Sequence, residues 1–183
     1  MKILIAAAAA VSALALAGTA SAQVYGNIGY SYLDGDTVNL GGPTAVIGWK
    51  SSTPLGVEAE GSIGTDKDTT SKGASATRIH MRSQWAGYVT ATSHVGETFE
   101  AGVRVGYGSM TIKETPAATF TGPPFVNHED LNSWNYGFIG QWVYDGANGI
   151  RLDYTRMNFS DNGVKDINRW TISWTHKFGV MPK

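Results

Sequence analysis

The chain has 183 residues, of which 14 are basic and 15 are acidic, and it contains no cysteine. Disulfides, thiol chemistry and a cysteine-ligated zinc site are therefore excluded, and the balanced charge gives no indication of nucleic acid as a partner. The length suits one domain, and the 23 Gly, 8 Tyr and 6 Trp favour an all-β protein with many turns.

The beginning of the chain has the three parts of a secretory signal peptide. A positively charged start precedes an almost entirely apolar run over residues 3–17, and the small residues 20–22 (A-S-A) fit a cleavage site. A transmembrane helix is the alternative, but the apolar run is shorter than the ~20 residues that a spanning helix needs. We therefore predict a signal peptide over residues 1–22 and a mature domain over residues 23–183.

Along the mature chain, large apolar residues alternate with small or polar ones, which is the two-residue period of a β-strand. In chain order, this alternation predicts strands at 24–33, 44–50, 57–64, 77–91, 99–111, 134–144, 150–157 and 169–178. The connections between these strands alternate strictly between long, polar loops and short turns, beginning with a long loop after the first strand.

The alternation of connections is typical of a barrel in an outer membrane. Such barrels have short periplasmic turns and longer extracellular loops, with both ends of the chain on the periplasmic side. After residue 22 no segment is long and apolar enough for a spanning helix, and in lipid only helices and closed barrels satisfy every backbone group. We therefore predict an all-β fold, an eight-stranded antiparallel transmembrane up-and-down β-barrel.

A period of two does not say which face of a strand points inward, so a soluble, lipocalin-like barrel is the alternative. The polar faces carry charges of both signs in mid-strand, which suits a paired network inside a barrel because a buried charge must be paired. Aromatic residues cluster near both strand ends, as in interfacial girdles. We predict an interior charge network of Glu58, Glu60, Arg82, Glu100, Arg104, Arg151, Asp153 and Lys177.

The last predicted strand, 169–178, resembles the C-terminal signal by which outer-membrane barrel proteins are recognised for insertion. The residues of that signal would be Trp170, Ile172, Trp174 and Phe178. The family usually stops at the final aromatic residue, whereas this chain continues to Lys183. Signal peptide, alternating strands, loop asymmetry and closing strand together resemble the small outer-membrane β-barrel family that includes opacity-type and OmpA-like transmembrane domains.

The resemblance implies a location in the outer membrane of a Gram-negative bacterium, and a role as a structural barrel, an adhesin, a narrow channel or occasionally a lipid-modifying enzyme. We expect a non-catalytic structural or surface-interaction role, with a narrow porin-like channel for ions or small solutes as the alternative. A lipid-modifying enzyme is less expected, because none of the four histidines stands where a nucleophile and its base could meet. We expect no cofactor and no bound metal.

The longest predicted loop, 112–133, carries Phe120 and Phe125 among prolines. Apolar residues on an exposed loop often mark a contact site, although this loop could instead fold over the barrel mouth and pack on itself. The expected partners are outer-membrane lipid and lipopolysaccharide, the barrel-insertion machinery, and a host surface or phage bound through the loops.

Overall fold

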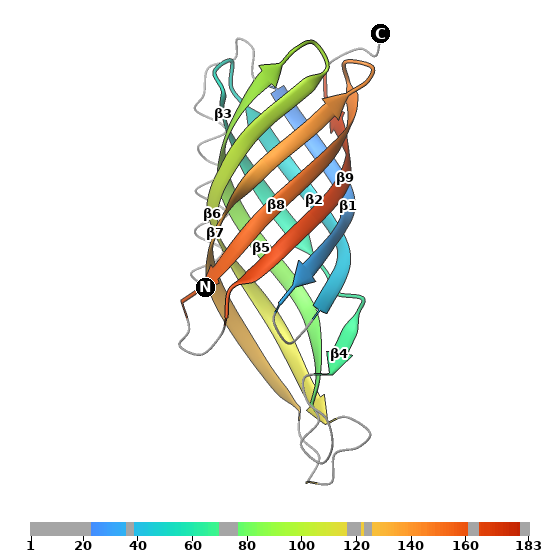
Figure 1. The fold of residues 1–183 in the computed structure, drawn as a ribbon, viewed down its shortest axis with the longest axis vertical. Helices are drawn as coiled ribbons and strands as arrows, with labels where there is room; N and C mark the ends of the chain where they lie inside the picture. Colours follow the sequence, from blue (N-terminus) through green and yellow to red (C-terminus); the bar gives the residue numbers. More distant parts are fainter. Residues whose placement is uncertain are drawn as a thin grey trace.

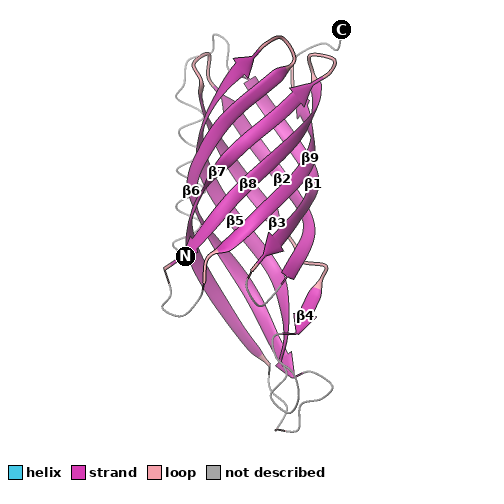
Figure 2. Cartoon of the chain, viewed as in Figure 1, coloured by secondary structure: helices cyan, strands magenta, loops and turns pink. Residues whose placement is uncertain are grey.

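The computed structural model describes residues 23–35, 39–69, 77–116, 122, 126–160 and 165–179. These residues form a closed antiparallel barrel of eight strands, which confirms the predicted fold (Figures 1 and 2). No helix among them is long and apolar enough to cross a membrane. The predicted signal peptide, residues 1–22, lies outside the described residues.

The strands are β1 (Gln23–Asp34), β2 (Asn39–Lys50), β3 (Leu55–Ser62), β4 (Lys67–Thr69), β5 (Thr77–Val95), β6 (Phe99–Pro116), β7 (Asn127–Val143), β8 (Asn148–Phe159) and β9 (Ile167–Lys177). All except β4 form the barrel, which closes because β1 pairs with β9 and β3 pairs with β5. The short strand β4 pairs with the start of β5 and falls in a stretch that the sequence predicted to be a loop.

The register of the strands sets the width of the barrel. Following paired residues through all eight strands from Gln23 leads back to β1 at Leu33, ten residues beyond the start. In an eight-stranded barrel this stagger corresponds to strands tilted by roughly 40°, and the interior is just wide enough to be filled by side chains. The interior is therefore a packed space in which every polar group needs a partner.

The outer wall is an apolar belt. Ile28, Ile47, Trp85, Phe138 and Ile172 are each more than half exposed there, whereas the residues next to them along their strands point inward. Aromatic side chains border the belt near both ends of the strands, as in the girdles of membrane barrels. This arrangement is the reverse of the soluble, lipocalin-like alternative, which would turn the large apolar residues inward.

The short turns lie at one end of the barrel, at the top of Figure 1, and glycine allows their tight geometry. Gly96 and Gly146 both have φ of 81°, a left-handed conformation that other residues rarely adopt. In the turn from β7 to β8, the side chain of Asp145 accepts hydrogen bonds from the side chain and backbone of Asn148 and from the backbone of Ala147. These bonds, with Asn148 contributing most, lower the pKa of Asp145.

Three strands extend beyond the barrel at the opposite end, where the long loops lie (Figure 1). β5, β6 and β7 have 19, 18 and 17 residues, whereas crossing a bilayer needs roughly 9–11. The sequence pattern ended the fifth predicted strand, which corresponds to β6, at residue 111 and began the sixth, which corresponds to β7, at residue 134, because polar and charged residues interrupt the apolar alternation there. A strand in water needs no apolar face, so the apolar alternation can stop while the strands continue. We call the parts of β5, β6 and β7 that extend beyond the barrel, together with β4, the extension.

The prediction that Arg82 belongs to the interior network is wrong. Met81 pairs with Ile112 and Ser83 with Thr111, which leaves Arg82 as the extra residue of a β-bulge. Because the bulge shifts the inward–outward alternation by one residue, Met81 is fully buried and Arg82 is exposed. The alternation of the sequence continues through this point without a visible break.

Candidate functional site: the barrel interior and the extension

The middle of the barrel interior is filled by equal numbers of opposite charges. Three carboxylates and three guanidinium groups lie there, each at most 3% exposed. We call them the central charge cluster: Glu58, Glu60, Asp153, Arg104, Arg151 and Arg169. Neutrality is what allows so many charges to be buried together, because each needs a compensating partner.

Arg151 connects opposite walls of the barrel. It lies on β8, four strands away from β3 in either direction around the barrel. Its Nη1 and Nη2 donate to the two carboxylate oxygens of Glu58 at 2.5 and 3.0 Å, a bidentate geometry that fixes the guanidinium plane. Its Nε donates to Asp153 at 2.9 Å, and the hydroxyl of Tyr25 donates to the same Glu58 carboxylate at 2.5 Å.

The other two arginines share Glu60. Nη1 of Arg104 lies 3.1 Å from one of its oxygens, and Arg169 forms an ion pair with the other. Nε of Arg104 donates to the hydroxyl of Thr155 at 2.9 Å, and its guanidinium lies 4.5 Å from the ring centroid of Tyr88. Each guanidinium in the cluster therefore has a carboxylate partner, and the network joins β3, β6, β8 and β9.

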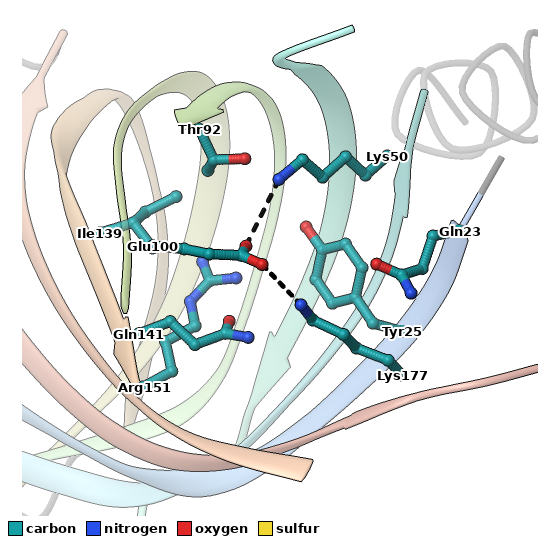
Figure 3. A pocket seen from close by; sticks show the side chains of 9 residues that line it. All are labelled: Gln23, Tyr25, Lys50, Thr92, Glu100, Ile139, Gln141, Arg151 and Lys177. Carbon is teal, nitrogen blue, oxygen red and sulfur yellow. Dashed lines mark hydrogen bonds and ion pairs between the residues drawn. The ribbon is translucent and has the colours of Figure 1, made fainter. Parts of the chain in front are cut away.

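A second, smaller group of charges occupies the end of the interior at the short turns. Figure 3 shows Lys50 and Lys177, from different strands, reaching the two oxygens of Glu100, at 3.3 and 2.5 Å. His94 lies 3.7 Å from the same carboxylate. The cavity beside these residues has a volume of about 20 Å³, which is space for one water molecule.

The end of the interior at the long loops is apolar. Eight side chains with at most 8% exposure pack together there, which we call the apolar plug: Leu33, Leu40, Met81, Met110, Ile112, Leu131, Met157 and Phe159. Ions and water passing along the barrel axis would have to cross this layer after the central charge cluster.

The structure therefore places seven of the eight residues of the expected network inside the barrel, all except Arg82. Pattern analysis missed Arg169 and Lys50, which stand at the ends of their predicted strands. Arg169 could have been found, because it continues the polar face of Thr171, Ser173 and Thr175 by the period of two. Arg169 is 0% exposed, which makes it the most enclosed charge of the cluster.

The residues of the expected insertion signal lie together on the outer wall. Trp170, Ile172, Trp174 and Phe178 are all between 43% and 59% exposed on the lipid side of the last strand and its end. The loop residues Phe120 and Phe125 lie outside the described residues.

The contacts of the histidines involve no hydroxyl group among the described residues. Nδ1 of His80 lies 2.9 Å from the backbone oxygen of Asp66, and Nδ1 of His176 lies 2.8 Å from Oδ1 of Asn148. His94 faces Glu100, as described above, and His128 is exposed on the extension. In the same part of the chain, no three His, Cys, Asp or Glu residues are grouped so that they could hold a metal ion.

A closed barrel with a charged interior and an apolar outer belt defines a transmembrane β-barrel of the outer-membrane class. In agreement, residues 3–178 match the family described as "Outer membrane protein beta-barrel domain", and the chain belongs to that family. No curated protein matches the sequence.

Solved structures show the same fold at low sequence identity. Ail of Yersinia pestis, in complex with the heparin analogue sucrose octasulfate, is 13% identical with a TM-score of 0.57, covering 87% of this chain and 100% of that one. The N-terminal barrel of Pseudomonas aeruginosa OprF is 8% identical, with a TM-score of 0.55 and coverages of 84% and 96%. Neisserial surface protein A is 8% identical, with a TM-score of 0.53 and coverages of 87% and 97%.

Proposed function

We propose that this outer-membrane barrel neither conducts solutes nor catalyses a reaction, and that it presents the extension at the cell surface for contact with other molecules. The filled interior supports the absence of conduction. The three strands that continue past the bilayer support the presentation of the extension at the cell surface. The chain would be exported by a cleaved signal peptide over residues 1–22. The insertion machinery would recognise the aromatic face of β9, and the mature barrel would sit among outer-membrane lipid and lipopolysaccharide.

The narrow-channel alternative can be tested directly. A planar bilayer containing the refolded barrel should show no discrete current steps, because the central charge cluster and the apolar plug both close the interior. Insertion is checked separately in the same membranes, by protection of the barrel strands from protease. A lack of current is then not mistaken for a lack of inserted protein. Reproducible steps of one size from inserted protein would establish a water path and contradict the proposal.

A catalytic role is not supported by the geometry of the histidines. Hydrolysis of a lipid by a histidine base requires a serine or similar nucleophile within hydrogen-bond reach. His176, the histidine near the lipid belt, is hydrogen-bonded to Asn148, stacks on Trp174 and meets Phe178 edge to face. Those contacts suit an interfacial anchor at the end of β9.

The extension carries an open strand edge. β7 pairs with β6 from Asn127 onward, but its pairing with β8 begins only at Ser133, so among the described residues no strand covers the outer edge before that point. The carbonyl of Asn132 accepts from the backbone of Ser160, which shows that its backbone groups point to this edge. Since the backbone groups of alternate residues point to the same side, those of Asp130 and His128 do so too. An open edge of this kind can bind an extended segment of another protein by strand addition.

Adhesion of cells to epithelial monolayers tests the role of the extension. His128→Pro should reduce adhesion to that of cells lacking the protein, because proline removes a backbone donor from the open edge without affecting the pairing with β6. His128→Ala, which keeps the donor and removes only the ring, should adhere like the unchanged protein. Deletion of residues 119–126, which include Phe120 and Phe125, should also reduce adhesion if the loop contributes. Full adhesion by both the proline variant and the deletion would refute the proposal.

A further inference from the structure

Four basic side chains lie in one row across the extension. Lys67 of β4 is directly opposite His80 of β5, His80 is opposite Lys113 of β6, and Lys113 is opposite His128 of β7. Residues directly opposite each other in a sheet share a face, so all four side chains stand on the same side. A row of this kind depends on the register of four strands and is not visible in the sequence.

Two arginines enlarge this row. Arg78 is two residues from His80 on β5, which places it on the same face, and it is exposed. Arg82 is exposed because the bulge turns it away from the interior. We call the six residues the basic face: Lys67, Arg78, His80, Arg82, Lys113 and His128.

The acidic residues of the extension mostly occupy the other side. Asp68 and Glu114 are both opposite Ile79, and Glu129 is opposite Ile112, whose side chain belongs to the buried apolar plug. They therefore share the side of the sheet that faces the barrel axis. Neighbouring residues such as Lys113 and Glu114 thus place opposite charges on opposite faces.

Two carboxylates border the basic face, and both are already hydrogen-bonded. Asp66 accepts from the hydroxyl of Tyr30 at 2.8 Å, and Asp130 accepts from the hydroxyl of Thr111 at 2.6 Å. Among the described residues, the ion pairs on the outer surface and at the barrel mouth are formed by other cations, such as Arg156 with Asp166. The lysines and arginines of the basic face, four permanent charges, are therefore in excess over the carboxylates beside them.

The position of the basic face relative to the membrane indicates its ligand. Trp85, Tyr107 and Trp134 belong to the aromatic girdle at the long-loop end, which marks the edge of the hydrocarbon layer. Arg82 lies three residues beyond Trp85 along β5, or roughly 10 Å along the strand. The face is continuous with the lipid-facing wall, so it stands at the level of the lipid head groups.

We infer that the basic face binds the phosphate groups of lipopolysaccharide in the outer leaflet of the membrane. Positive side chains just outside the hydrocarbon layer attract anionic lipid head groups, and each contributes separately to the attraction. Lipopolysaccharide is the occupant to which the geometry points, because the cations follow the membrane-facing side of the sheet and not its open edge or tip. The inference assigns a binding site to lipopolysaccharide, which the proposed function already places around the barrel. It does not depend on the adhesive role of the extension.

Binding of purified lipopolysaccharide to the refolded mature barrel in zwitterionic detergent tests this inference. The double variant Arg82→Gln/Lys113→Gln should raise the Kd roughly tenfold or more, because two of the four permanent charges are removed. Dephosphorylated lipopolysaccharide should bind the unchanged barrel as weakly as intact lipopolysaccharide binds the variant. Added salt should reduce the difference between the two proteins, since exposed charges are screened.

The matched control is Glu114→Gln/Glu129→Gln, which changes the residues next to Lys113 on β6 and next to His128 on β7, both on the opposite face. Its Kd for lipopolysaccharide should equal that of the unchanged barrel, whereas attraction by net charge alone would make it bind more tightly. The inference is overturned if the basic-face variant binds normally, or if the control changes the affinity as much. It is also overturned if the variant loses binding of soluble heparin but keeps that of lipopolysaccharide, which would assign the face to a soluble polyanion.

Discussion

Replacing Arg151 with methionine should lower the free energy of unfolding by about 3–5 kcal/mol, the cost of breaking a buried ion pair by removing one partner. The guanidinium donates to both oxygens of Glu58 and to Asp153, and all three residues are at most 3% exposed. Methionine fills much of the same space but leaves both carboxylates without their main cation. Unfolding by urea in lipid vesicles, followed by tryptophan fluorescence, measures the change.

Arg82→Met is the matched control, because it makes the same chemical change on the outside of the barrel. Its effect on the free energy of unfolding should stay within about 0.5 kcal/mol, as for most surface substitutions. The double variant Arg151→Met/Glu58→Gln should be more stable than Arg151→Met alone, since it no longer buries the Glu58 charge unpaired. Equal effects of Arg151→Met and Arg82→Met would mean that water screens the interior, and would contradict the packed interior described above.

The period of two, together with the charges of both signs on the polar faces, was sufficient to predict most of the interior. Glu58, Glu60, Arg104, Arg151 and Asp153 each stand between residues that suit a lipid-facing wall, so the inward face follows from the sequence alone. Their pairing does not follow from it, because the register around the closed barrel decides which opposite charges meet. Arg151 and Glu58 are 93 residues apart in sequence and come into contact only because their strands lie on opposite walls.

Two further errors of pattern analysis concern the long-loop end of the strands. A bulge adds one residue to a strand without changing the apparent alternation, so Arg82 was assigned to the wrong side. Beyond the bilayer, apolar residues are no longer needed on the outside, so the ends of β6 and β7 look like loop in the sequence. Both errors fall in the extension, which is the part from which we propose contact with lipopolysaccharide and with other molecules. Lipid requires apolar residues on the outer face of a strand, and the resulting alternation identifies the strand in the sequence. Beyond the bilayer this requirement is absent, so the outer surface can carry residues that bind other molecules.

Gly137→Ala should be far more damaging than Gly87→Ala, lowering the free energy of unfolding by more than about 2 kcal/mol. Gly137 lies inside the barrel, directly opposite Arg104 on one side and Thr155 on the other. A Cβ atom there would overlap the carbonyl oxygen of Tyr154 and lie 2.8 Å from its carbonyl carbon. Backbone atoms cannot rotate away as a side chain can, so β7 and β8 would have to move apart.

Gly87→Ala provides the comparison, because Gly87 lies on the exposed outer wall and a Cβ atom there would meet its nearest neighbour only at 4.0 Å. Neither glycine has positive φ, so the two substitutions differ in the space available and not in backbone strain. Gly87→Ala should be neutral or stabilising by up to about 1 kcal/mol, since alanine loses less backbone entropy on folding. Separation of β7 from β8 would also displace Thr155 from Arg104, so Gly137→Ala and Arg104→Met should show a combined effect smaller than the sum of the two. Strict additivity, or similar effects of the two glycine substitutions, would show that the strands relax around the added methyl group and that the charge cluster tolerates a shift in register.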